Sequence, residues 1–363
     1  MKATQQLHDL GQSLWLDNIT RGLLTSGTLV RYISDLSVTG LTSNPTIFDH
    51  AIQKGGFYDD AIRKKALAGK SGEELFFELA LEDLMQAADL FRPVHDATGA
   101  ADGWVSLEVS PLLADDTATT IKAAAQLHAR AQRPNLFIKI PGTRAGIPAI
   151  EESIFSGVPV NVTLLFSREQ YVAAAEAYMR GIERRIAAGL DPKVGSVASL
   201  FVSRWDVAVK DKVPEGLRNR LGIAIAMRTY TAYRDLLEST RWQKLAASGA
   251  LPQRLLWAST GTKDPAAPDT LYLEALAAPD TINTIPEKTL LAFADHGKAL
   301  RILPPEDDGA EELLVEFVRE GIDHAAFAIE LQREGTLSFA KSWSDLMACI
   351  ASKSELLAKA DQT

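Results

Sequence analysis

A lysine stands within the apolar run NLFIKIP (135–141), which has the composition of a buried β-strand. Burial disfavours the charged form of an amine and so lowers its pKa, and the uncharged amine of Lys139 would attack a carbonyl carbon to form an imine. A protonated imine accepts the electrons of a breaking carbon–carbon bond. Lys139 is therefore a candidate nucleophile; alternatively, it reaches solvent at the sheet edge or neutralises a carboxylate.

Two carboxylates occupy comparable positions: Glu108 lies in SLEVS (106–110) and Asp17 in LWLDN (14–18). Glu108 could move protons through a water during imine formation and hydrolysis, or form a structural ion pair with Lys139. Asp17 could take a hydroxyl proton during bond cleavage, or cap the loop after its strand. Metal binding by the two carboxylates is a third possibility, which the lack of a histidine at ligand spacing disfavours.

Hydroxyl and amide side chains near other strand ends are candidates for binding a sugar. Asn44 and Asn161 can hydrogen-bond to substrate hydroxyls, although Asn44 precedes Pro45 and is also typical of turns. The other polar residues at these positions are Thr42, Thr163 and Ser199. Together with Lys139 and the two carboxylates, they would face a common rim if the strands are parallel.

A cationic group follows in the last third of the chain. Arg204 offers a bidentate fork, and Ser259 with Lys263 in ASTGTK (258–263) adds a hydroxyl and a point charge. These are the groups that hold a phosphate, although solvated surface charge is the plainer explanation for Lys263. ASTGTK is not a P-loop, because it lacks the GxxxxGK[ST] frame.

The elements that must position these residues are short β-rich runs alternating with helical patterns, which is typical of a parallel sheet built from βα units. Several runs are apolar over most of their length, as expected for strands covered on both faces. The runs are 13–19, 38–44, 104–110, 135–141, 158–166, 195–202, 254–260 and 280–286. Eight such units fit an α/β fold of the closed (β/α)8 TIM-barrel type better than an open doubly wound sheet, which usually has fewer strands.

We expect one domain over residues 1–363, with the barrel at about 8–300 and a helical extension at about 301–363. Residues 45–103, between the second and third strands, are expected to hold extra helices. The extension includes a last helix near 341–359, and its helices are expected to pack on the outside of the barrel.

Two helix starts show the spacing of a capping box, a Ser followed three residues later by Glu or Gln. Ser167 and Gln170 stand after the fifth strand, and Ser71 and Glu74 stand between the second and third. Both pairs predict a helix that begins at the serine.

Composition narrows the classes of function. The chain of 363 residues has 38 Lys and Arg against 47 Asp and Glu, a formal net charge of −9, and no basic run. This balance disfavours a nucleic-acid or anionic-membrane partner. Cys349 is the single cysteine, so an internal disulfide is excluded, and no run of about 18 apolar residues predicts a membrane span. No secretory signal is expected in the first thirty residues, and we expect a cytoplasmic protein.

Several of these runs resemble the motifs of the transaldolase family, most closely its longer bacterial branch, which carries the ASTGxK element. The similar segments are GLTSNPTIF (40–48), SLEVS (106–110), NLFIKIPGTRAG (135–146), PVNVTLLFS (159–167) and ASLFVSRWD (198–206). They occur in the family's order, and the resemblance extends from about Trp15 to His296.

The resemblance implies a role for each matching position. Lys139 would form the Schiff base with a ketose phosphate, Glu108 with Thr163 and a water would assist the carbinolamine, and Asp17 would take the C4 hydroxyl proton. The pocket would be lined by Asn44, Asn161, Thr42 and Ser199, and the phosphate would be held by Arg204 and Ser259. Short-branch members place an arginine two residues after that serine, where this chain has Gly261, so Lys263 is only a plausible second cation.

The reaction implied by the resemblance is transfer of a dihydroxyacetone unit from sedoheptulose 7-phosphate to glyceraldehyde 3-phosphate in the non-oxidative pentose phosphate pathway. The products are erythrose 4-phosphate and fructose 6-phosphate, and no metal or organic cofactor is implied. Three alternatives stay open: a class I aldolase that releases free dihydroxyacetone, a metal-dependent barrel using the two carboxylates, and a non-catalytic barrel that binds sugar phosphates. Oligomeric state is left open by the sequence.

Overall fold

The eight β-rich runs form a closed barrel of parallel strands in the order β1 to β8, so the predicted TIM-barrel fold is confirmed. The structure is a computed structural model, and it describes residues 2–298, 302–304, 306 and 309–360. The strands are β1 (Ser13–Asp17), β2 (Val38–Thr42), β3 (Val105–Glu108), β4 (Leu136–Pro141), β5 (Val160–Leu165), β6 (Ser196–Phe201), β7 (Gln253–Ala258) and β8 (Ile282–Ile285). Each lies within one of the predicted runs or overlaps it closely.

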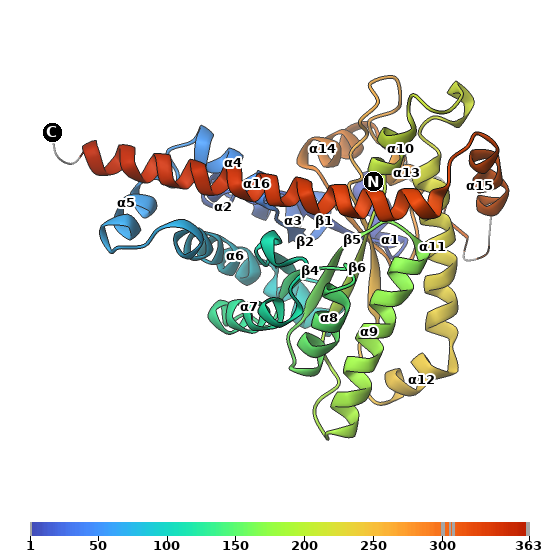
Figure 1. Cartoon of the computed structure of the whole chain (residues 1–363), viewed down its shortest axis with the longest axis horizontal. Coiled ribbons are helices and arrows are strands. Elements are labelled where there is room, and N and C mark those ends of the chain that lie inside the picture. The colour runs from blue at the N-terminus through green and yellow to red at the C-terminus, as the bar shows by residue number, and fades with distance from the viewer. Residues whose placement is uncertain (1, 299–301, 305, 307–308, 361–363) are drawn as a thin grey trace.

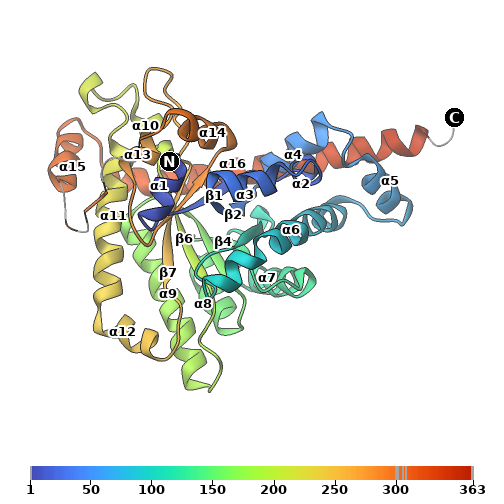
Figure 2. The same cartoon turned by 180° about the vertical axis from the view of Figure 1, so that it is seen from behind.

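Helices surround the barrel in the layer expected of βα units (Figures 1 and 2). They are α1 (Ala3–Asp9), α2 (Arg21–Thr25), α3 (Thr28–Leu36), α4 (Pro45–Lys54), α5 (Asp59–Leu67), α6 (Gly72–Ala97), η1 (Pro111–Leu113), α7 (Thr117–Ala131), α8 (Gly146–Phe155), α9 (Arg168–Ala187), α10 (Ser203–Val209), η2 (Glu215–Leu217), α11 (Leu221–Glu238), α12 (Thr240–Ala247), α13 (Leu271–Ala275), α14 (Glu287–His296), α15 (Ala310–Arg319) and α16 (His324–Ala360). The extra helices predicted between the second and third strands are α4, α5 and α6. None of the helices in the described ranges is both long enough and apolar enough to cross a membrane.

The register of the strands brings the polar positions to one level of the barrel. Glu108 on β3 pairs with Lys139 on β4, and Lys139 pairs with Asn161 on β5. Asp17 on β1 is likewise level with Thr42 on β2. Because side chains alternate along a strand, residues at one level point to the same side of the sheet. These five side chains therefore converge near the carboxyl ends of their strands.

The opposite end of the barrel is closed by a buried polar network. The carboxylate of Asp102 accepts hydrogen bonds from Trp15 Nε1 at 2.8 Å, from the backbone N–H of Gly103 at 2.9 Å and from the Ser13 hydroxyl. The Ser13 hydroxyl also accepts from the Arg254 guanidinium at 2.8 Å. These contacts satisfy a carboxylate that would be costly to bury alone.

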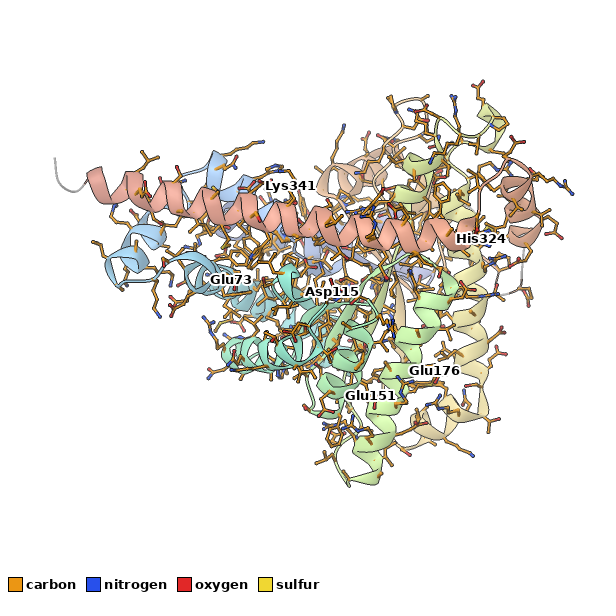
Figure 3. All side chains as sticks on the ribbon, in the orientation of Figure 1. Glu73, Asp115, Glu151, Glu176, His324 and Lys341 are labelled. Carbon is orange, nitrogen blue, oxygen red and sulfur yellow. The ribbon has the colours of Figure 1, made fainter. Side chains whose placement is uncertain are left out.

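The C-terminal region differs from the prediction of a separate last helix on the outside of the barrel. Residues 324–360 form the single helix α16, which crosses the mouth and continues past the barrel beside α4 and α5 (Figure 1). His324 marks its beginning and Lys341 its middle in Figure 3. The predicted last helix near 341–359 is the C-terminal half of this longer helix, and Gly335, in its first half, packs directly on Leu164.

Of the two predicted capping boxes, one is confirmed. Ser167 accepts a hydrogen bond from the backbone N–H of Gln170, and α9 begins after it. The second prediction is half wrong: α6 does begin after Ser71, but the serine side chain makes no capping hydrogen bond, and Glu74 pairs with Lys70 instead. An adjacent lysine offers the glutamate a charged partner in place of a backbone N–H.

Candidate active site

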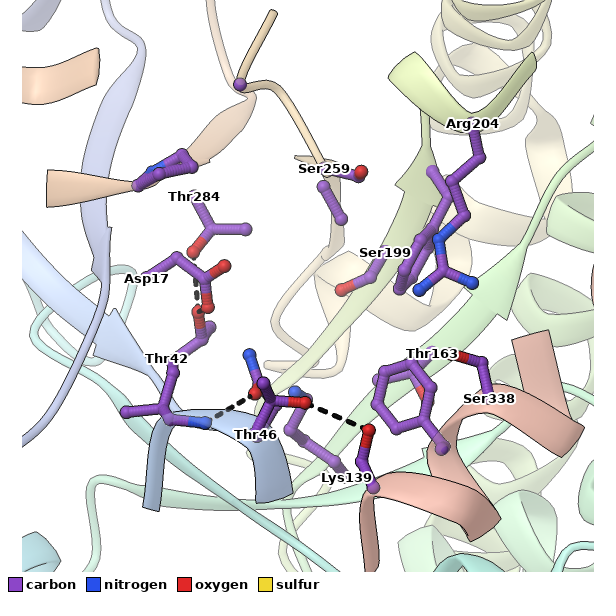
Figure 4. A pocket seen from close by; sticks show the side chains of 18 of the residues that line it. Asp17, Thr42, Thr46, Lys139, Thr163, Ser199, Arg204, Ser259, Thr284 and Ser338 are labelled. Carbon is purple, nitrogen blue, oxygen red and sulfur yellow. Dashed lines mark hydrogen bonds between the residues drawn. The ribbon is translucent and has the colours of Figure 1, made fainter. Parts of the chain in front are cut away.

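The mouth of the barrel holds a cavity of about 270 Å³, and the predicted site residues gather around it (Figure 4). Those that line it are Asp17, Thr42, Asn44, Lys139, Asn161, Thr163, Ser199, Arg204, Ser259 and Lys263. Glu108 is the exception, since it lies behind Lys139 and faces a separate, smaller cavity. Predicted residues from six strands and their following loops thus meet at one cavity, as the strand-end argument predicted.

Lys139 is buried at the base of the cavity, with 7% of its surface exposed. Its Nζ donates a hydrogen bond to the backbone carbonyl of Ser43 at 2.7 Å and lies 3.8 Å from Glu108 Oε2. The Lys139 charge also acts on Asp17. The amine therefore has the Glu108 carboxylate behind it, and Asp17 lines the same cavity.

Glu108 occupies a secluded position, 6% exposed, that suits a group working through water. Burial raises its pKa above the ordinary value, the Lys139 ammonium opposes that shift, and the Asp17 charge adds to it. Glu108 Oε2 and Thr163 Oγ1 are buried without a hydrogen-bond partner among the described residues. The cavity beside Glu108 measures about 10 Å³, which is close to the space of one water molecule.

Asp17 faces the cavity from β1 and is held by a chain of hydroxyl groups. Thr42 Oγ1 donates to Asp17 Oδ1 at 3.0 Å and lies 2.6 Å from the hydroxyl of Thr284 on β8. Burial raises the pKa of Asp17, while the charge of Lys139, the bond from Thr42 and the charge of Lys263 lower it. Near neutral pH, such a carboxyl group is better suited to act as a base than an exposed aspartate.

Two amides border the lysine. Asn161 donates to Ser106 Oγ at 3.2 Å and accepts from Ser199 Oγ at 2.7 Å, so its orientation is fixed. The Asn44 side chain accepts from the backbone N–H of Ile47 at 3.1 Å and thereby caps α4. Asn44 therefore forms the cap of α4 and also lines the cavity, and its contact with substrate hydroxyls stays a prediction.

Arg204 enters the cavity with its charge uncompensated. Within the described part of the chain its guanidinium makes neither a hydrogen bond nor an ion pair, and it lies 5.3 Å from the ring centre of Phe201 and 5.8 Å from that of Phe339. Burial lowers its pKa, and the charge of Glu334 opposes that shift. The guanidinium has five N–H donors, lies near both aromatic rings and lines the cavity. This arrangement is suited to binding an anion.

Two residues at the site have a left-handed backbone that is uncommon outside glycine. Ser259 has φ 57°, and its hydroxyl lies 2.9 Å from that of Ser203. Leu164, directly after Thr163, has φ 58° at an irregularity in the pairing of β5 with β6. Such conformations cost about 1–3 kcal/mol each and are retained where they place a neighbouring group. Here they place Ser259 and Thr163.

Sequence reasoning missed part of the cavity wall. Thr284 could have been found, since it is a polar residue directly before the last residue of β8, in DTINTIP. The other missed residues are Phe201 on β6, Thr46, Ile47 and His50 on α4, and Ser338, Phe339 and Ser342 on α16. Thr46, Ile47 and Phe201 lie within the similar segments 40–48 and 198–206, but none of them is a polar residue at a strand end. The residues of α16 lie outside every such segment and reach the mouth through helix packing.

No three His, Cys, Asp or Glu side chains within the described ranges gather closely enough to hold a metal ion. The charges of Lys139 and Lys263 act on Asp17. A cation between Asp17 and Glu108 would have to compete with the ammonium group already there.

Comparison with known proteins gives a consistent match over nearly the whole chain. Residues 14–350 match the family described as Transaldolase/Fructose-6-phosphate aldolase. A transaldolase of Parafrankia sp. (strain EAN1pec) is 43% identical over 358 residues, which cover 96% of this chain and 97% of the relative. A transaldolase of Thermobifida fusca is 44% identical over 356 residues, with the same coverage, and one of Arthrobacter sp. (strain FB24) is 44% identical over 353 residues, 95% of each chain.

Proposed function

We propose that this chain, which belongs to the transaldolase/fructose-6-phosphate aldolase family, works through an imine on Lys139. It is a transaldolase, a transferase of the pentose phosphate pathway. The observation that carries this proposal is the buried amine of Lys139, 3.8 Å from one carboxylate and electrostatically coupled to a second. Its substrates are phosphorylated sugars. We propose that it moves a dihydroxyacetone unit from sedoheptulose 7-phosphate to glyceraldehyde 3-phosphate, giving erythrose 4-phosphate and fructose 6-phosphate.

The first step is imine formation. The Lys139 nitrogen attacks the C2 carbonyl carbon of the ketose, the carbonyl oxygen gains a proton, and the resulting carbinolamine loses one water. Glu108 and Thr163 support this step, because each has a buried oxygen without a hydrogen-bond partner among the described residues. Glu108 Oε2 lies 3.8 Å from the amine and Thr163 lines the same cavity as Lys139, so a water held by them can move the protons. The raised pKa of Glu108 lets it both give and accept a proton.

The second step breaks the C3–C4 bond. Asp17 takes the proton of the C4 hydroxyl, the C3–C4 electrons move into the protonated imine, and the aldose phosphate leaves as an aldehyde. The enamine that remains attacks the acceptor aldehyde, and Asp17 returns its proton to the new hydroxyl group. One water, used to hydrolyse the final imine, balances the one released at the start. Asn44 and Asn161 are placed to hold the dihydroxyacetone hydroxyls, with Thr42 and Ser199 beside them.

Transfer, as opposed to release, is tested by the dependence of product on the acceptor. With fructose 6-phosphate as donor, we expect sedoheptulose 7-phosphate to form when erythrose 4-phosphate is added. Without an acceptor, free dihydroxyacetone is expected to accumulate far more slowly, because the enamine is held away from water. Equal rates of dihydroxyacetone release with and without acceptor would identify a lyase instead. Binding of fructose 6-phosphate with no turnover in either assay would indicate a non-catalytic barrel.

We further propose that Arg204, Ser259 and Lys263 hold the phosphate. Lys263 lines the same cavity as Arg204 and Ser259, which supports it as the second cation although its spacing departs from the short-branch pattern.

Replacing Arg204 by Gln is expected to raise KM for fructose 6-phosphate about 10- to 100-fold, since a charge-assisted bond to the phosphate is lost. KM for unphosphorylated fructose should change little. Steady-state kinetics with both sugars test this, with exposed Arg218→Gln as the matched control; equal changes for both sugars would contradict it.

The pH dependence of turnover should reveal the charges around Asp17. Its carboxylate is the active form and burial raises its pKa, so activity is lost as the pH falls through a value above that of an ordinary aspartate. Lys263 lowers this pKa, so Lys263→Met should raise it and move the acid limb of kcat to higher pH. The measurement is kcat against pH at saturating fructose 6-phosphate, with exposed Lys244→Met as control. An acid limb that stays in place, or moves to lower pH, would contradict this assignment.

A further inference from the structure

The side chain of Arg204 is held in place by aromatic rings from two different parts of the chain. Phe201 belongs to the same strand-to-helix connection, whereas Phe339 comes from α16, far away in sequence. No hydrogen bond or ion pair within the described residues fixes the guanidinium. A long, charged side chain without such a bond samples several rotamers unless packing restricts it. The rings are therefore what restricts Arg204 before a substrate arrives.

α16 is seated closely enough at this point to act on Arg204. Gln332 donates hydrogen bonds to the carbonyls of Gly142 at 3.0 Å and Leu164 at 2.9 Å, which ties the helix to the ends of β4 and β5. Gly335 allows the approach, because a Cβ there would lie 2.9 Å from Leu164 Cδ2 and 3.5 Å from an Arg204 guanidinium nitrogen. One turn further on, Ser338 and Phe339 reach the cavity, and Figure 4 shows Ser338 on this helix on the same side as Arg204.

A competing partner for Arg204 is also carried by α16. The charge of Glu334 acts on the guanidinium, yet the two groups form no ion pair within 4.0 Å. Glu334 is exposed, so an ion pair with it would draw Arg204 out of the cavity. The Phe339 ring favours the inward position, because a cation packed on an aromatic face gains an attraction that does not depend on solvent-exposed charge.

We propose that Phe339 is a positioning residue for Arg204, so that α16 sets the preference of the enzyme for phosphorylated over unphosphorylated sugars. This inference rests on the proposed function, in which Arg204 binds the phosphate. Phe339 itself needs no contact with the sugar. Its removal should weaken phosphate binding by freeing Arg204. Because Phe339 also borders the small cavity beside Glu108, a change in kcat that is equal for both sugars is compatible with the positioning role, and the selective change in KM is its signature.

The test compares variants of the full-length enzyme in steady-state assays with fructose 6-phosphate and with fructose. For Phe339→Ala we expect KM for fructose 6-phosphate to rise about tenfold and KM for fructose to stay unchanged, with any change in kcat the same for both sugars. Phe339→Tyr keeps an aromatic face and should stay within about threefold of wild type. Phe327→Ala is the matched control: Phe327 lies on the same helix and packs on another cation, Lys212, and it does not line the cavity.

Each outcome either supports or overturns the inference. If Phe339→Ala changed KM for both sugars alike, or for neither, while Arg204→Gln remained selective for the phosphorylated sugar, the positioning role would be wrong and the phosphate contact would stand. If Arg204→Gln itself showed no selectivity, the proposed phosphate site would fail as well. Should Phe339→Ala fold poorly, Phe339→Leu preserves the apolar packing without the ring, and a smaller but still selective rise in KM is expected. A Phe339→Leu enzyme with wild-type KM for both sugars would overturn the inference.

Discussion

Replacing Lys139 by Met should reduce turnover of fructose 6-phosphate with erythrose 4-phosphate at least about 10⁴-fold, because no other group can form the imine that accepts the electrons of the C3–C4 bond. Methionine has a similar length and is apolar, so it suits a side chain that is 7% exposed. The fold should therefore be retained. A coupled assay for consumption of erythrose 4-phosphate gives the rate, and circular dichroism reports the fold.

The exposed lysine on α12 provides the comparison for this variant. Lys244→Met removes the same charge at the other end of the barrel and should keep wild-type turnover. If Lys139→Met kept substantial activity, the imine mechanism would be wrong. If it lost its circular-dichroism spectrum together with its activity, Lys139 would be a structural lysine that neutralises Glu108.

Replacing Asp17 by Asn should block the reaction one step later. The amide keeps the size of the side chain but cannot take the C4 hydroxyl proton, so kcat should fall by about 10²- to 10⁴-fold. Imine formation should continue, since it depends on Lys139 and Glu108. Borohydride reduction of this variant with fructose 6-phosphate should therefore trap the intact six-carbon sugar phosphate on the enzyme, whereas the wild type traps a three-carbon fragment.

A buried aspartate at the closed end of the barrel is the control for Asp17. Asp102→Asn weakens a network that holds Trp15 and Ser13, so it should lower thermal stability but leave kcat close to wild type. A three-carbon adduct formed by Asp17→Asn at the wild-type rate would show that another group is the base for bond cleavage. Failure to trap any adduct would place Asp17 in imine formation instead.

Much of the fold could be predicted because the barrel repeats a strong local signal. Strands such as β5 and β6, covered on both faces, are apolar runs bounded by turn residues, and each is followed by a helical pattern. Only a few sheet topologies are compatible with eight consecutive repeats of that signal. Several predicted strands extend up to two residues past the observed strand end, because the alternation pattern does not separate the last strand residue from the polar residues that follow it. Helix α9 was also marked by its cap, Ser167.

The site followed from the fold by a simple rule, which is also why part of it was missed. Polar residues at the ends of parallel strands meet at one rim, so Asp17, Lys139 and Asn161 could be assigned to one place before the structure was known. The rule predicts which side chains point toward the mouth of the barrel, but it does not predict how deeply each side chain is buried. It did not reveal that Glu108 lies behind Lys139 in its own small cavity.

The contribution of α16 could not be predicted because it depends on long-range packing. The helix is anchored by contacts such as Trp343 with Glu73, at 2.9 Å, and Lys353 with the carbonyl of Ile52, at 2.6 Å. Nothing in the local sequence indicates that these partners face one another. Glycine weakens a helix in general, but Gly335 allows α16 to pack closely on Leu164.

The most direct test of the mechanism is mass spectrometry of the wild-type enzyme after borohydride reduction in the presence of fructose 6-phosphate, followed by peptide mapping. The account predicts one three-carbon adduct per chain, on the peptide that contains Lys139, and none on Lys139→Met. An adduct on a different lysine, or an enzyme that turns over sugar phosphates while no adduct forms on any residue, would contradict it.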